Sequence, residues 1–126
     1  MDPRCVLYTT AFADVYGGGQ KSLLLILKSL NIKEFKPILM LPDYGAMAEL
    51  AAQANIETVI LRTPALRSMD FIKCLKSFLK LGKILKDKRI DLIHTDHPRH
   101  TLYLGILSKI LRIPLIWHVR IAQAEN

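Results

Sequence analysis

The stretch DLIHTDHPRHTLYLGILSKILRIPLIWHV, residues 91–119, contains the pattern that decides the fold. Its two ends, 91–95 and 114–119, are short apolar runs of the kind that form fully buried strands. Between them, 101–112 has apolar residues at helical spacing. A strand, a helix and a second strand in this order predict two parallel strands joined by a helical crossover.

The same alternation continues toward the N-terminus. We expect strands at 5–10, 36–41 and 57–61, and helices at 20–30, 46–54 and 70–87. Five apolar strands alternating with four helices predict an α/β fold: a three-layer, doubly wound parallel sheet, Rossmann-like, in the order 3-2-1-4-5. In such a sheet a crevice opens at the carboxyl ends of strands one and four, where the loops near 11, 42, 62, 96 and 120 should meet.

Length and composition limit the classes of protein. The 126 residues, 51% hydrophobic and 23% charged, fit one globular domain over 1–126 and exclude a disordered chain. The longest aliphatic run, 23–27, is far short of the roughly 20 residues of a membrane span. No secretory signal is recognisable, so we expect a cytoplasmic protein with Cys5 and Cys74 reduced.

The net charge of +7 comes mostly from the stretch between Arg67 and Arg89, which contains eight basic residues and two acidic ones. On the helix predicted there, four lysines fall within a sector of about 80°. An anionic membrane surface would attract this face, placing the protein at the inner side of the membrane. The alternative is a solvated face of a helix that packs on a sheet. We expect no nucleic acid, since no aromatic residues interleave with the lysines. The four are Lys73, Lys76, Lys80 and Lys83, opposite Phe71, Leu75, Phe78, Leu79 and Leu85.

Three consecutive glycines, Gly17, Gly18 and Gly19, precede the helix predicted at 20–30. Glycine allows a ligand to approach the backbone closely, and the free N–H groups of a helix start attract phosphate. Gln20 departs from a Walker loop, and Ser22 departs from a dinucleotide fingerprint, which makes half of a nicotinamide dehydrogenase a weaker hypothesis. The alternative is a flexible turn that caps the helix.

The segment His94-Thr95-Asp96-His97-Pro98-Arg99-His100 follows the fourth predicted strand. We expect no metal, because Pro98 should break the helix on which the histidine spacing would align. His97 and Arg99 instead suit a polar rim that binds a hydroxylated or anionic ligand. A purely structural role, such as capping the next helix, is the alternative.

The fifth strand ends in Trp117-His118-Val119-Arg120. Residues two apart in an extended chain lie on one side, so His118 and Arg120 should place a titratable donor and a fixed positive charge at the edge of the cleft. The alternative is a histidine bonded to the backbone. The sequence shows no Ser–His–Asp set and no clear pair of catalytic carboxylates.

Together these segments resemble the N-terminal domain of family-4 glycosyltransferases, retaining enzymes of the GT-B fold with two facing Rossmann-like domains. The resemblance lies in the glycine run with its Leu-rich helix (17–30), in Asp91-Leu92-Ile93-His94-Thr95 with Pro98, and in Pro114-Leu115-Ile116-Trp117-His118-Val119-Arg120. It implies that this chain is one half of a GT-B fold.

The resemblance also implies roles for individual residues. The glycine loop, Gly18 and Gly19 above all, would approach the phosphates of a nucleotide-sugar donor. His118 would contact the donor sugar and phosphates at the reaction centre, and His97 and Arg99 would line the cleft on the acceptor side. The acceptor would be a lipid-linked molecule or a polysaccharide, and no cofactor or metal is implied.

The family's C-terminal donor-binding domain has no counterpart in this sequence, so we expect the chain to be inactive without that partner. Two other hypotheses stay open: a non-catalytic nucleotide- or phosphate-binding module, and a membrane-surface interaction module. The leading interpretation requires the glycines, the 94–100 segment and 117–120 to share one pocket rim.

Overall fold

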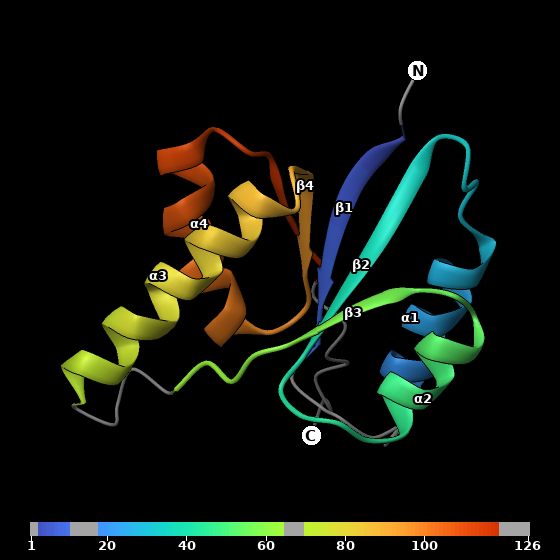
Figure 1. Ribbon diagram of the computed structural model, residues 1–126, viewed down its shortest axis with the longest axis horizontal. Coiled ribbons are helices and arrows are strands. Elements are labelled where there is room, and N and C mark those ends of the chain that lie inside the picture. Colours follow the sequence, from blue (N-terminus) through green and yellow to red (C-terminus); the bar gives the residue numbers. More distant parts are fainter. Residues whose placement is uncertain (1–2, 11–17, 65–69, 119–126) are drawn as a thin grey trace, which may run out of the picture.

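The computed structural model describes residues 3–10, 18–64 and 70–118, and within them strands and helices alternate strictly (Figure 1). The chain orders its elements as the apolar runs predict. The strands are β1 (Arg4–Thr9), β2 (Phe35–Leu41), β3 (Glu57–Ile60), β4 (Ile90–Thr95) and β5 (Leu115–Trp117); the helices are α1 (Gly18–Ser29), α2 (Ala46–Gln53), α3 (Phe71–Asp87) and α4 (Pro98–Leu111).

The five strands form one parallel sheet in the order β3-β2-β1-β4-β5, which confirms the predicted topology. The central strand β1 pairs with β2 from Arg4 opposite Phe35 to Thr9 opposite Met40, and with β4 on its other side. The winding of the sheet therefore reverses between β1 and β4, and ligands bind at the carboxyl ends of such strands.

Helices cover both faces of the sheet, α1 and α2 on one side and α3 and α4 on the other (Figure 1). Successive side chains of β1 point to opposite faces. Val6 and Tyr8 therefore pack with α1 and α2, whereas Leu7 packs with α3 and α4. The two cores are separate, and alternate residues along a strand pack into one core or the other.

The start of α4 corrects one prediction. Pro98 does not break a helix; it occupies the first turn of α4, where its fixed φ suits a helix and its missing N–H costs nothing. His97 is the N-cap, and its Nδ1 accepts a hydrogen bond from the backbone N–H of Arg99 at 3.2 Å. The helix therefore begins three residues earlier than the sequence pattern suggested.

The helix α3 corrects a second prediction. Its lysine face is exposed as expected, but only part of its predicted apolar face packs: Leu85 is buried, and Phe78 is partly buried against the same core. Ser77, Leu81 and Leu85, spaced by four residues, are the buried positions. Three of the predicted apolar-face residues are exposed instead: Phe71 by 85%, Leu75 by 53% and Leu79 by 63%. Only one narrow arc of α3 meets the sheet, because α4 covers the same face beside it.

Among the described residues, no helix is both long and apolar enough to cross a membrane.

Candidate functional site

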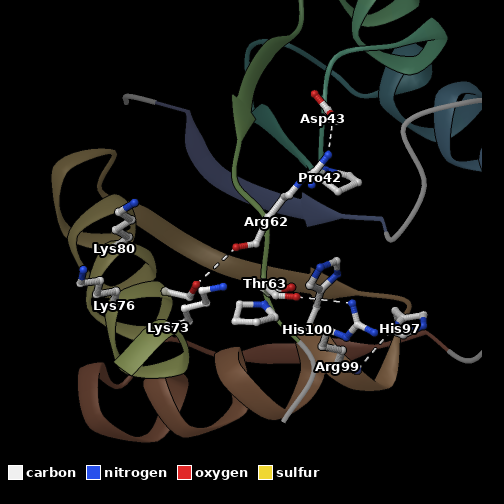
Figure 2. Close-up of a pocket in the computed structure, with 12 residues that line it drawn as sticks. Pro42, Asp43, Arg62, Thr63, Lys73, Lys76, Lys80, His97, Arg99 and His100 are labelled. Carbon is white, nitrogen blue, oxygen red and sulfur yellow. Dashed lines mark hydrogen bonds and ion pairs between the residues drawn. The ribbon is translucent and has the colours of Figure 1, made fainter. Parts of the chain in front are cut away.

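A pocket of about 590 Å³ lies beside the carboxyl ends of β2 and β3, on the α3 and α4 side of the sheet (Figure 2). Side chains from α3 form one wall, the first turn of α4 forms the other, and the segment after β3 runs between them. The residues around it are Pro42, Asp43, Arg62, Thr63, Pro64, Lys73, Lys76, Ser77, Lys80, His97, Arg99 and His100.

The 62–64 segment is held in place by hydroxyl and guanidinium donors from both helices. Ser77 donates to the carbonyl of Arg62 at 3.3 Å, and Tyr103 donates to the carbonyl of Pro64 at 2.8 Å. Arg99 donates to the carbonyl of Thr63 at 3.4 Å. These bonds hold the segment against both helices and so fix the pocket wall.

The pocket is strongly basic, with five cationic side chains and one carboxylate around it. That carboxylate, Asp43, already accepts from Arg62 at 2.7 Å, and this hydrogen bond holds the pKa of Asp43 below its usual range. Lys73 pairs with Asp70, which caps α3, at 3.7 Å. Lys76, Lys80 and Arg99 pair with no carboxylate among the described residues.

Two histidines stand in the α4 wall, with ring centroids 6.0 Å apart. Burial, and then the positive charge of Arg99, lower the pKa of His97. His100 is only 4% exposed, and burial lowers its pKa to about 4, with His97 and Arg99 acting in the same direction. His100 is therefore neutral at pH 7, and its Nδ1 has no hydrogen-bond partner among the described residues.

A second group of rings lies across the sheet edge. Tyr8 of β1 and His94 of β4 have ring centroids 5.0 Å apart, and His94 and His118 are 5.6 Å apart. His118 is exposed and directly follows β5, where its backbone N–H donates to the carbonyl of Thr95 at 2.7 Å. Tyr8 packs in the core formed with α1 and α2, so this row belongs to that side.

The helix α1 also lies on that side and begins at Gly18. Two of the three glycines are thus the first residues of the helix itself and not of a loop before it. The first turn of α1 carries no acidic residue, so nothing in it competes with an anion for the exposed N–H groups. Gly17 and Arg120 lie outside the described residues.

The predicted site residues are therefore divided between two places, and the basic pocket does not bring them to the single rim that the leading interpretation requires. His97 and Arg99 share the pocket with three of the four predicted membrane lysines, Lys73, Lys76 and Lys80. Lys83 is outside it, and His118 is not among the residues around it. Sequence reasoning missed Arg62, Ser77 and His100 as members of this site. Arg62 could have been found, because it stands where the loop after the third strand was expected to reach the cleft.

An apolar groove of about 320 Å³ lies between α3 and α4, next to the basic pocket along α3. Its α3 side is made by Phe71, Cys74, Leu75 and Phe78, and its α4 side by Leu102, Tyr103 and Ile106. Within the parts of the chain that the structure covers, no group of three or more His, Cys, Asp or Glu side chains could hold a metal ion.

Comparison with known proteins places this fold among solved structures. A glycosyltransferase from Rickettsia africae matches 93% of this chain with a TM-score of 0.76 and 17% identity, and HepE from Anabaena in complex with UDP and glucose matches 92% with 0.70 and 20%. The chain covers only 30% of either protein. The C-terminal domain of a Pyrococcus furiosus hydrogenase matches 94% of this chain and 94% of its own length, with 0.63 and 16%.

No protein-family description and no curated protein matches the sequence. At these low identities the structural matches establish the fold: a Rossmann-like domain that glycosyltransferases and a hydrogenase domain share. Function has to be argued from the site itself.

Proposed function

We propose that this chain is the N-terminal domain of a GT-B glycosyltransferase, which transfers a sugar from a nucleotide-sugar donor to an acceptor hydroxyl. The observation that carries the proposal is the arrangement of the sheet edge. A glycine start of a helix and an exposed histidine lie toward one face, and a basic pocket lies toward the other. The fold of HepE, which was solved with UDP and glucose, supports it.

The donor would lie on the α1 side. The N–H groups at Gly18 and Gly19 would approach its phosphates, with Gly17 beside them, and His118 would contact the sugar and phosphates at the reacting bond. Catalysis would consist of positioning and of stabilising the negative charge that develops on the departing diphosphate. We assign the retaining reaction of family 4 to this arrangement, with no metal or other cofactor taking part.

The acceptor would lie on the α3 and α4 side, with His97 and Arg99 lining its site and Arg120 at the edge of the cleft. A lipid-linked molecule or a polysaccharide is the acceptor class we propose. A second Rossmann-like domain would face the sheet edge and hold most of the nucleotide, so the chain would turn over only together with that domain.

A second candidate function, attachment to an anionic membrane surface, rests on α3. Its exposed apolar side chains, Phe71, Ile72, Leu75 and Leu79, lie next to its exposed lysines on the helix surface. Apolar side chains that enter a headgroup region, flanked by lysines that attract anionic lipids, are the elements of an interfacial helix. Lys83 would act here with the three pocket lysines, and the protein would then lie at the inner face of the membrane.

The test is a transfer assay with the two-domain enzyme that contains this chain, which measures release of nucleoside diphosphate from a panel of nucleotide sugars. We expect His118→Ala to lower turnover about 100-fold or more, because a donor that stabilises the transition state is lost. The thermal midpoint should not change, since His118 is exposed. As a control, Ile116→Ala, which changes a residue of β5 two positions before His118, should keep turnover within about twofold.

Undiminished turnover in His118→Ala would remove the role of that histidine. Calorimetry then separates the enzyme from a non-catalytic nucleotide- or phosphate-binding module. Stronger binding of a nucleotide sugar than of the plain nucleotide favours the enzyme, and equal weak binding of both favours the module.

A further inference from the structure

Among the described residues, the basic pocket is surrounded by five cationic side chains and a single carboxylate, which already accepts from one of them. The carbonyls of Arg62, Thr63 and Pro64 each accept one hydrogen bond from a side chain of α3 or α4. In neutral His97, Nδ1 accepts from Arg99, so the proton is on Nε2 and makes that nitrogen a donor. Donors therefore outnumber acceptors around the pocket, which favours a ligand whose polar atoms are mostly acceptors.

Its charge specifies the ligand further. Lys76 and Lys80 extend from one wall and Arg99 from the other, and none of the three pairs with a described carboxylate. Three uncompensated cations around a space of about 590 Å³ match a group with more than one negative charge and several oxygens. Among the described residues, no Phe, Tyr or Trp side chain lies around the pocket on which a nucleobase would stack.

His100 is the independent observation. It lies in the pocket wall, is 4% exposed, and has an Nδ1 with no hydrogen-bond partner among the described residues. A buried polar nitrogen without a partner costs free energy unless something supplies one. Nδ1 is itself shielded from solvent, so a ligand oxygen would supply the partner only after the imidazole ring turns toward the pocket.

We infer that this pocket binds a phosphoryl group, either a phosphomonoester or a diphosphate, between the lysines of α3 and Arg99 of α4. Nothing in the inference involves the glycine start of α1, so the pocket is a second anion site. If the proposed glycosyltransferase function holds, on which this last step rests, the acceptor carries a phosphate close to the hydroxyl that receives the sugar. The apolar groove beside α3 is in reach of a lipid attached to that phosphate.

The experiment uses the 126-residue chain and two probes that separate a free phosphate from a lipid headgroup. Inorganic pyrophosphate is titrated by NMR, with the backbone amides and histidine rings as reporters. Vesicles of phosphatidylcholine with phosphatidic acid are tested by co-sedimentation. We expect pyrophosphate to shift the resonances of His97, Arg99 and His100, and Arg99→Gln and Lys76→Gln each to weaken binding of at least one probe about tenfold.

The matched control is Lys86→Gln, which removes the same charge from an exposed position on α3, about 15 Å along the helix from Lys76. It should weaken binding by less than about twofold, because charges beyond a Debye length are screened. An effect of Lys86→Gln equal to that of the pocket variants would overturn the inference. So would pyrophosphate shifts confined to the start of α1, or pocket variants that change neither probe.

Failure of this inference and failure of the proposed function can be told apart. The titration needs no second domain and no transfer, so a chain that binds pyrophosphate in the pocket keeps the inference even if no sugar is moved. The converse result is also possible. If transfer depends on His118 but Arg99→Gln binds both probes normally, the proposed enzyme function stands and the phosphate site is ruled out.

Discussion

The two sides of the sheet differ in the side chains that they bring to the same edge. On the α1 and α2 side, the rings of Tyr8, His94 and His118 follow one another across the strands, and the neighbouring helix starts at glycine. On the α3 and α4 side, cationic side chains surround a pocket, and apolar ones stand out from α3. One parallel sheet therefore carries a row of rings toward one face and a basic pocket toward the other.

This difference follows from how each helix meets the sheet. Residues along a helix face repeat every three to four positions, and only the arc in contact with the strands is buried. In α3 that arc is narrow, and its lysines and two of its leucines, Leu75 and Leu79, remain outside it. The variants below compare the two sides, beginning with the largest expected effect.

The packing arc of α3 can be tested with two leucines that are two residues apart. Leu81 is fully buried in the α3 and α4 core, whereas Leu79 is 63% exposed. We expect Leu81→Ala to lower the free energy of unfolding by about 2–5 kcal/mol, since it leaves a cavity. Leu79→Ala should change it by no more than about 0.5 kcal/mol. Urea unfolding measures both, and equal losses would contradict the orientation of the helix.

The pocket side should also be the acid-sensitive side. The pKa of His100 falls from 6.5 to about 4 on folding, so between these values the unfolded chain takes up a proton that the folded chain refuses. Stability is unaffected above pH 6.5 and is lost as the pH falls toward 4. Between pH 6.5 and 5 the loss from His100 should be roughly 2 kcal/mol.

Urea unfolding at pH 7 and at pH 5 checks this prediction. His97, Arg99 and the pocket lysines face His100 from α4 and α3, while Asp43 and Arg62 lie at the ends of β2 and β3. Of these, His97 also has a lowered pKa and adds loss in the same direction. His100→Gln should remove the part due to His100, and an unchanged pH dependence in that variant would contradict its assignment.

The smallest effect concerns the membrane. Leu79 on α3 and Leu25 on α1 are equally suitable exposed leucines, at 63% and 68%. If α3 enters an anionic surface, Leu79→Ser should weaken co-sedimentation with phosphatidylglycerol vesicles about tenfold, the cost of withdrawing part of one leucine from apolar surroundings. Leu25→Ser should have almost no effect. Equal effects, or binding that ignores lipid charge, would remove the membrane proposal.

Much of the fold could be read from the sequence. Strands buried on both faces are continuous apolar runs, and their alternation with helical patterns leaves few topologies open. The boundaries of the elements were less predictable. At α4 the sequence predicts that Pro98 breaks the helix, whereas in the structure Pro98 begins it. Proline breaks a helix when it lies in the interior but favours a helix when it lies in the first turn. The N-cap at His97 is what identifies Pro98 as a first-turn proline.

The candidate site was predicted in part. His97 and Arg99 were expected at a cleft, and they are in the pocket. For the lysines of α3 the sequence predicts a membrane-facing or a solvated surface and not a pocket wall, since helix periodicity gives the face of a residue but not what lies opposite that face. Ser77 and His100 carried no signal in the sequence, because their roles come from contact with a loop and from burial.

The sequence by itself determined the order of strands and helices and the positive charge of α3, because periodicity and charge are properties of neighbouring residues along the chain. Only the tertiary structure decided that three of these lysines, Lys73, Lys76 and Lys80, lie across a pocket from Arg99 in the next helix, and that His118 belongs to the other group of rings. The physical reason is that a parallel sheet brings distant loops to one edge and then divides them between its two faces, and that division depends on strand pairing and helix packing.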